Sequence, residues 1–249
     1  MKSKLFSRAS IIGRLLRLPL DLLPEDLVVR ILRGKMRGVR WVKGAGEHGY
    51  WLGTYEQRKR KAMEGLLRAG QIFFDIGANV GYFSLLAAKL TAPDGFVVAF
   101  EPLPRNTNFL RQHIGLNALE QRIKLYEAAV SDHDGKTFFD LGKSSAMGHI
   151  ASQGQLEVQL LSLDSLIKSG EVPMPDVMKI DVEGAEFEVL QGAKEILAEH
   201  HPLLFIDTHA RTAHDKSIQC LLELGYELEL LDGKPLAESK EIIASWHKN

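Results

Sequence analysis

The chain has 249 residues, of which 45% are hydrophobic and 25% charged, and its formal net charge at pH 7 is −1. This is enough for one α/β domain with an appendage, and the near-neutral charge excludes a global nucleic-acid-binding signature. The single cysteine, Cys220, excludes an internal disulfide and suits a reducing cytoplasm. No apolar run approaches the ~20 residues of a membrane span.

Residues 1–54 are predicted to form a basic N-terminal extension of helices and a hairpin. Residues 1–40 contain ten Lys or Arg but only three Asp or Glu. Residues 6–18 interleave Ile, Leu and Arg, so they could form an amphipathic helix that either packs on the rest of the protein or touches the inner face of a membrane peripherally. A short helix is expected over residues 27–32, and a small hairpin around residues 39–42.

Residues 55–249 alternate between strand-like and helix-like segments, which predicts a mostly parallel sheet with helices on both faces. The expected strands cover residues 72–76, 96–100, 123–130, 177–181, 203–207, 226–231 and 242–246. The expected helices cover residues 55–68, 80–90, 105–116, 187–198 and 215–224. Residues 136–141 and 156–161 look like an inserted β-hairpin, and the long polar loop between them, which includes His149, is a candidate substrate lid.

The first two strands of this domain end in residues that suit a nucleoside cofactor. The first strand ends in Asp75 and a turn flanked by Gly77 and Gly81, and the second strand ends in Glu101. Glycine allows positive φ and close approach of a ligand to the backbone, and the following helix offers free N–H groups. A glutamate at the end of the second strand can accept both ribose hydroxyls.

The spacing of this turn favours S-adenosylmethionine (SAM) over a dinucleotide. Dinucleotide sites use G-x-G-x-x-G, whereas position 79 here is Asn79. Asp75, ahead of the turn, suits the methionine ammonium of SAM better than a pyrophosphate. A nicotinamide-linked oxidoreductase is therefore the less favoured alternative.

Further residues are cofactor candidates by position. Asn79 lies in the turn with Tyr82, although it is equally suited to capping the helix. Pro102 follows the ribose-binding glutamate, and nearby Asn106 could bond to that glutamate or cap the second helix. Small residues at the end of the third strand, where an adenine ring would fit, are Ala128 and Ala129.

Carboxylates and a histidine at the ends of the fourth and fifth strands are the catalytic candidates. They are Asp181, Glu183, Asp207 and His209. A hydroxyl that receives a methyl group needs a base or a metal to lower its pKa. Histidine is a natural base near neutral pH, whereas Asp181, Asp207 and His209 together could also hold a divalent metal. Both alternatives stay open, and Glu186 is interpreted as favourable pairing with a helix N-terminus.

Several motifs together resemble the FkbM family of SAM-dependent methyltransferases. They are residues 74–83, 99–102, 127–132, 163–164 and 178–193, of which the Lys-Ile-Asp-Val-Glu-Gly-Ala-Glu run at 179–186 is the most specific. The resemblance implies a Rossmann-like class I methyltransferase fold with an antiparallel seventh strand. It also implies O-methylation of a small-molecule or glycan hydroxyl, as on a sugar, glycolipid or secondary metabolite. FkbM-like chains often have glutamate where this chain has Asp207. The alternative is a non-catalytic SAM-fold binding or assembly protein that docks through its basic N-terminus.

Overall fold

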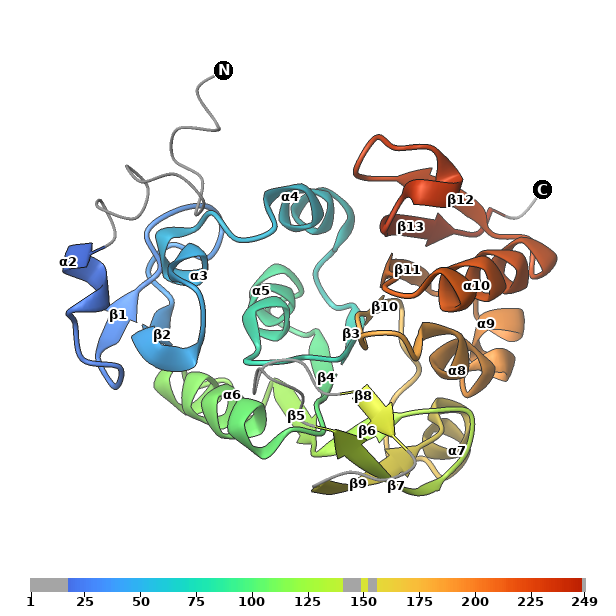
Figure 1. Cartoon of the computed structure of the whole chain (residues 1–249), viewed down its shortest axis with the longest axis horizontal. Helices are drawn as coiled ribbons and strands as arrows, with labels where there is room; N and C mark the ends of the chain where they lie inside the picture. Colours follow the sequence, from blue (N-terminus) through green and yellow to red (C-terminus); the bar gives the residue numbers. More distant parts are fainter. Residues whose placement is uncertain (1–17, 141–148, 152–155, 248–249) are drawn as a thin grey trace. The chain divides into compact units, whose positions relative to one another are not determined.

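The computed structural model describes residues 18–140, 149–151 and 156–247 (Figure 1). The chain divides into two compact units, Met1–Tyr55 and Glu56–Asn249. Nearly all of the predicted amphipathic helix at residues 6–18, and most of the proposed lid, lie outside the described residues. Within the described ranges, no helix combines the length and the apolar character needed to cross a bilayer.

The first unit contains a two-stranded antiparallel sheet where a helix was predicted. Strand β1 (Val28–Arg30) pairs with β2 (Arg40–Val42). The helix predicted over residues 27–32 is therefore wrong, because this run is rich in β-branched residues that favour strands. The remaining elements of the unit are α2 (Leu18–Asp21), η1 (Lys43–Ala45) and α3 (His48–Leu52).

The second unit is built on a seven-stranded sheet in the order β12-β13-β11-β10-β3-β4-β5. Only β13 runs antiparallel to its neighbours. The strands are β3 (Ile72–Ile76), β4 (Phe96–Phe100), β5 (Ile123–Tyr126), β10 (Val177–Ile180), β11 (Leu203–Asp207), β12 (Glu227–Leu230) and β13 (Glu241–Ser245). This confirms the predicted mostly parallel sheet and its antiparallel last strand.

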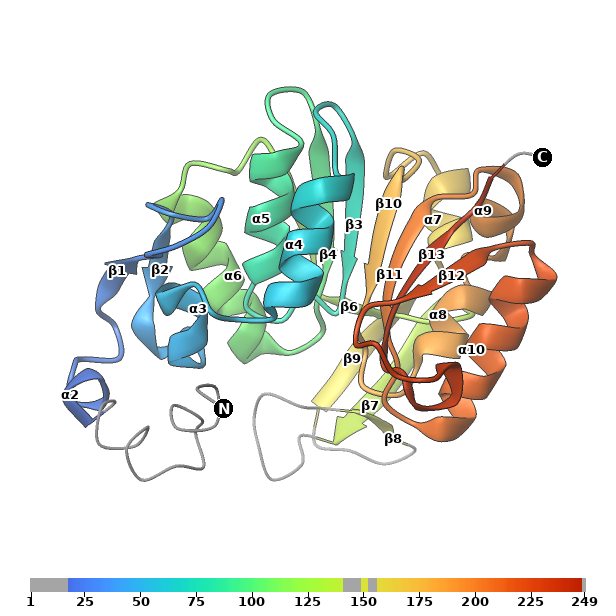
Figure 2. The same cartoon turned by 90° about the horizontal axis from the view of Figure 1, so that it is seen from above.

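Helices cover both faces of this sheet, as Figure 2 shows. One face carries α4 (Gln57–Leu66), α5 (Tyr82–Leu90) and α6 (Pro104–Leu116). The other carries α7 (Leu163–Lys168), α8 (Glu186–Gln191), α9 (Lys194–Glu199) and α10 (Arg211–Glu223), and η2 (Leu236–Glu238) precedes β13. An extensive core cluster lies between the sheet and this second set, and includes Phe74, Ile76, Met178, Ile180, Val189 and Leu190.

The single helix predicted over residues 187–198 is two helices, α8 and α9. The break falls at Gly192, where a Cβ would overlap the carbonyl oxygen of Ser131. The Gly192 carbonyl accepts hydrogen bonds from the backbone N–H of Asp164 and the hydroxyl of Ser162. These contacts from another segment hold the backbone of Gly192 in place and interrupt the helix there.

The strand predicted over residues 123–130 is also divided. Strand β5 ends at Tyr126, and β6 (Ala128–Val130) belongs to a separate four-stranded sheet with the order β6-β9-β7-β8. The other members are β7 (Gly135–Asp140), β8 (His149–Ala151) and β9 (Leu156–Leu161). The expected hairpin is present as the antiparallel pair β7 and β9, but β6 and β8 extend it to four strands.

A buried histidine on α6 should make the stability of the fold sensitive to acid. His113 is fully buried, its Nδ1 lies 2.8 Å from the carbonyl oxygen of Val80, and burial lowers its pKa from 6.5 to about 4. Below pH 6.5, His113 becomes protonated in the unfolded chain but stays neutral in the folded chain. The free energy of unfolding therefore decreases as the pH falls from 6.5 toward 4. At ~1.4 kcal/mol per pH unit, the loss reaches about 3 kcal/mol.

Urea unfolding of the wild type and of His113→Gln across this pH range measures the effect. The variant should show the shallower decline in free energy of unfolding below pH 6.5, because the other titrating groups are common to both proteins. Parallel pH profiles would contradict a lowered pKa for His113.

Candidate active site

The turn between β3 and α5 is tightly held against the end of β4. Gly77, Asn79 and Gly81 all have positive φ, of 74°, 49° and 91°. The backbone N–H groups of Gly77 and Ala78 both donate to the carbonyl oxygen of Phe100, at 3.0 and 2.9 Å. The side chain of Asn79 accepts from the N–H of Val80 at 2.8 Å. The predicted cofactor turn therefore exists as a rigid loop at the carboxyl edge of the sheet.

Packing explains both glycines of this turn. A Cβ on Gly77 would overlap the carbonyl oxygen of Asp181, at the end of β10, and one on Gly81 would overlap the side chain of Leu110 on α6. The predicted reason was close approach of a ligand. The structure adds that other parts of the chain already approach both glycines closely, and contact with a cofactor stays a prediction.

Glu101, directly after β4, is held by three N–H donors. Its Oε2 accepts from the backbone N–H of Asn79 at 2.8 Å, and its Oε1 accepts from the backbone of Leu103 at 2.9 Å and the side chain of Asn106 at 3.2 Å. Burial raises the pKa of Glu101, whereas these hydrogen bonds lower it. The predicted ribose ligand is thus oriented beside the turn, and the bond to Asn106 is the one that its position suggested.

Asp75 is fully buried and lies beside a buried lysine. It is the register partner of Lys179 on the neighbouring strand β10, so the two side chains share one face of the sheet. The Lys179 ammonium lies 3.1 Å from Asp75 Oδ1 and donates to the carbonyl oxygen of Gly77 at 3.0 Å. Asp75 Oδ2 accepts from the hydroxyl of Ser84 at 2.5 Å. Asp75 therefore helps to hold the turn through Lys179, which binds both Asp75 and the carbonyl oxygen of Gly77. Contact of Asp75 with a ligand stays a prediction.

A second buried lysine, Lys59 on α4, was not among the predicted site residues. Its ammonium forms ion pairs with Asp207 and with Glu56, the latter at 2.6 Å, and lies 3.8 Å from Asp181. Burial alone would lower the pKa of Lys59, but these carboxylates together raise it. Burial also raises the pKa of Asp207 to about 7, against the opposing effect of Lys59. Both lysines lie over the ring of Phe83.

All four predicted catalytic residues lie close together, because Asp207 is hydrogen-bonded to Asp181. The Nε2 atom of His209 lies 3.6 Å from Oδ1 of Asp181 and 3.5 Å from Oε2 of Glu183. The hydrogen bond of Nδ1 to Glu186, at 2.9 Å, raises the pKa of His209, and Asp181 and Glu183 raise it further. Asp207 instead faces Lys59, so the residues within reach of one metal ion are Asp181, Glu183 and His209 rather than the predicted set with Asp207.

The remaining predicted cofactor residues differ in their surroundings. Tyr82 is buried at the start of α5, and burial raises its pKa to about 12. Pro102 is half-buried in the loop before α6. Ala128 and Ala129 do not close β5 as predicted, because they form the buried strand β6, where Ala129 packs in a small cluster with Phe139 and Leu160.

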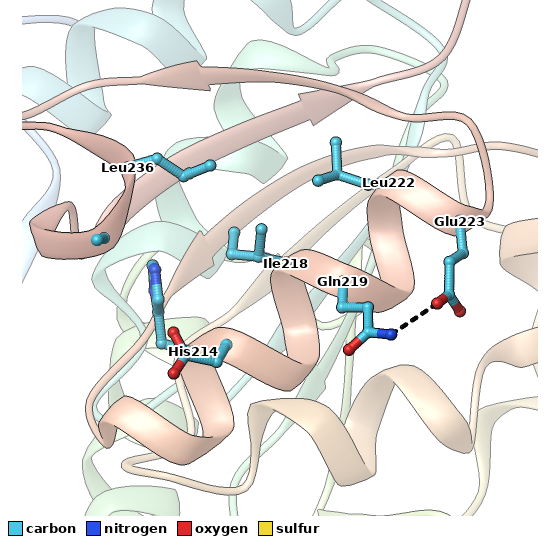
Figure 3. Close-up of a pocket in the computed structure, with 8 residues that line it drawn as sticks. His214, Ile218, Gln219, Leu222, Glu223 and Leu236 are labelled. Carbon is cyan, nitrogen blue, oxygen red and sulfur yellow. Dashed lines mark hydrogen bonds between the residues drawn. The ribbon is translucent and has the colours of Figure 1, made fainter.

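An open groove of about 620 Å³ lies between α10 and the segment around η2, as Figure 3 shows. It is lined mainly by the apolar side chains of Ile218, Leu222 and Leu236, with Gln219 and Glu223 hydrogen-bonded to each other along its side. None of its lining residues belongs to the predicted site.

Comparison with known proteins identifies the fold and the family of this chain. A crystal structure of an FkbM methyltransferase from Methylobacillus flagellatus KT superposes with a TM-score of 0.55 at 19% identity, covering 73% of this chain and 45% of that one. This confirms a Rossmann-like methyltransferase fold. The sequence model of the methyltransferase FkbM domain family matches residues 75–228 of this chain. The chain therefore belongs to this family.

Two curated methyltransferases are similar to part of this chain. The hexuronic acid methyltransferase AglP of Haloferax volcanii is 28% identical over 141 residues, covering 56% of each chain. The 2-O-methyltransferase NoeI of Sinorhizobium fredii is 28% identical over 158 residues, covering 55% of this chain and 63% of the relative. The matched segments thus span less than two thirds of either relative.

Proposed function

We propose that this protein is a SAM-dependent O-methyltransferase that methylates a hydroxyl group of a sugar, glycolipid or secondary metabolite. The observation that carries the proposal is the position of Glu101. Its carboxylate is fixed by three N–H donors beside the rigid turn at residues 77–81, at the same sheet edge as Asp181 and His209. The names of AglP and NoeI support a carbohydrate-like acceptor and oxygen as the methylated atom.

The residues present fit SAM, which supplies a methyl group on a sulfonium when bound. Glu101 offers a carboxylate to the ribose hydroxyls, and the turn between Gly77 and Gly81 lines the methionine end. The predicted adenine contact of Ala128 and Ala129 stays a prediction, because both residues are buried in β6. The turn has Asn79 where the dinucleotide-binding motif G-x-G-x-x-G has its second glycine.

The acceptor half of the site is the carboxylate and histidine cluster beyond β10 and β11. Asp181, Glu183 and His209 would orient the hydroxyl and manage its proton, and orientation alone can supply much of the rate acceleration. The ion pair of Lys59 with Asp207 lies beside this cluster and holds α4 over the sheet edge. Lys59 and Asp207 would thereby keep Asp181 in place.

Isothermal titration with SAM and detection of S-adenosylhomocysteine test the proposal. Glu101→Gln should weaken SAM binding by about 10- to 100-fold, because a hydrogen bond to a charged group contributes ~1.5–3 kcal/mol. The matched control is Glu120→Gln, an exposed carboxylate just before β5, at the opposite edge of the sheet. Its affinity should equal that of the wild type.

Turnover is tested with a panel of uronic acids and oligosaccharides. Production of S-adenosylhomocysteine that depends on one of these acceptors would support methyl transfer to a hydroxyl. If the wild type shows no affinity for SAM, or if Glu101→Gln binds it normally, the assignment of the cofactor site is wrong.

A further inference from the structure

Asp181, Glu183 and His209 form a cluster whose spacing suits a metal ion better than direct hydrogen bonds. The Nε2 atom of His209 is 3.6 and 3.5 Å from the nearest oxygens of the two carboxylates, and one ligand atom from each residue lies within 4.8 Å of the others. Nitrogen–oxygen separations of 3.5 and 3.6 Å exceed the usual hydrogen-bond range of about 2.7–3.2 Å. Ligands of a cation bound at ~2.0–2.2 Å are about 3–3.6 Å apart, so small side-chain shifts would complete the site.

A buried carboxylate fixes the histidine of this cluster in the orientation that a metal ligand needs. Glu186 is fully buried, and its Oε1 lies 2.9 Å from Nδ1 of His209 and accepts from the backbone N–H of Gly184 at 2.9 Å. With a proton on Nδ1, the lone pair of Nε2 points toward Asp181 and Glu183. Metal-binding histidines are generally oriented by such a carboxylate on the other ring nitrogen.

The same glutamate brings negative charge that, among the described residues, only His209 can balance directly, when its imidazole is protonated. Its second oxygen, Oε2, is buried and has no hydrogen-bond partner among those residues. The two buried lysines nearby already have carboxylate partners, namely Glu56 and Asp207 for Lys59 and Asp75 for Lys179. The excess of carboxylates over positive charges is therefore on the His209 side, where Lys240 adds only a distant electrostatic contribution at Glu183.

The cluster is also accessible. The side chains of Asp181, Glu183 and His209 are 22%, 38% and 32% exposed, so water or a substrate oxygen can reach the point between them. Catalytic metal sites keep such open positions, whereas structural sites are closed.

We propose that Asp181, Glu183 and His209 bind one divalent cation of the Mg²⁺ or Mn²⁺ type, with Glu186 as the residue that positions His209. Two carboxylates and one imidazole with open positions suit these ions. If the proposed methyl transfer is correct, the cation would lower the pKa of an acceptor hydroxyl bound to it. Hydroxyl oxygens of a sugar would then occupy the open positions of the cation. Binding of the ion itself does not depend on that function.

The test is Mn²⁺ titration of the full chain after removal of metals with a chelator, followed by isothermal calorimetry and by the electron paramagnetic resonance of free Mn²⁺. We expect one saturable site per chain. Glu183→Gln and His209→Gln should each weaken it at least about 100-fold, because even the loss of a residue that orients a ligand costs ~10–100-fold. Glu186→Gln should fall in that 10- to 100-fold range.

The matched control is Glu199→Gln, which removes an exposed carboxylate at the end of α9 and should bind Mn²⁺ like the wild type. Melting temperatures measured without metal show that each variant is folded, and added Mn²⁺ should raise the melting temperature of the wild type but not of Glu183→Gln. Absence of a saturable site, or equal affinity in Glu183→Gln and the wild type, would overturn the metal site. SAM binding and methyl transfer without a Mn²⁺ site would overturn it too and leave the proposed function standing.

Discussion

Replacing Lys179 with methionine should lower the free energy of unfolding by about 3–5 kcal/mol, because the substitution leaves a buried carboxylate without its counter-charge. Lys179 and Asp75 are 2% and 0% exposed, and their charged atoms are 3.1 Å apart. Burial would lower the pKa of Lys179, but Asp75 and Asp181 raise it, so the lysine is charged at neutral pH. Urea unfolding followed by circular dichroism measures the loss.

The double variant Lys179→Met with Asp75→Asn separates the unpaired charge from lost packing. It should recover much of the loss, because the buried charge is removed together with its partner. The matched control is Lys168→Met, which breaks the ion pair with Glu195 on the exposed surface and should change stability little. A double variant no more stable than Lys179→Met alone would show that packing, and not the charge of Asp75, accounts for the cost.

Gly77→Ala should destabilise the protein by about 2–5 kcal/mol, the sum of strain at positive φ and overpacking. The added Cβ would overlap the carbonyl oxygen of Asp181, and β3 and β10 cannot separate easily because they are paired in register. The same overlap should shift Asp181, so the affinity for SAM and for a metal ion should both fall. Thermal unfolding and titration measure the two effects.

Gly170→Ala is a close control, because its φ of 73° almost equals the 74° of Gly77, while its Cβ would meet no atom within 4 Å. It should lose only the ~1–2 kcal/mol of backbone strain. Equal losses in the two alanine variants would mean that the contact between Gly77 and Asp181 is unimportant.

The framework of the site was accessible from sequence because its signals are local. The apolar run before Gly77 and the run before Glu101 are short buried strands with an acid at the end, and the structure has both with the predicted bounds. The ends of parallel strands meet at one edge, so the proximity of Asp181 and His209 also followed from strand order.

Lys59 could not be found in this way. It lies in a helix between Arg58 and Arg60, where one more basic residue indicates a solvated face, and only the tertiary packing of α4 buries it. Lys179 did carry a signal, since a lysine inside the apolar run of β10 must have a partner when the strand is buried on both faces. Pairing Lys179 with Asp75, the other buried charge on the neighbouring strand β3, would have predicted this ion pair.

Residue spacing alone could not predict that Glu183, rather than Asp207, lies beside His209. Asp207 and His209 are two residues apart, but β11 ends at Asp207, so the alternation of a strand does not place both side chains on one side. Asp207 therefore pairs with Lys59, whereas His209 lies beside Glu183 in the segment after β10.

Asp181 is shared between two groups of charges. Its Oδ2 lies 3.8 Å from the ammonium groups of both Lys59 and Lys179, while its Oδ1 faces His209. A ligand that changes the charge on one side of this carboxylate must therefore alter the free energy of binding on the other, and thermodynamic linkage makes the change reciprocal. The proposed cofactor half and the proposed acceptor half of this edge should then behave as a cooperative pair, in which occupancy of one changes the affinity of the other.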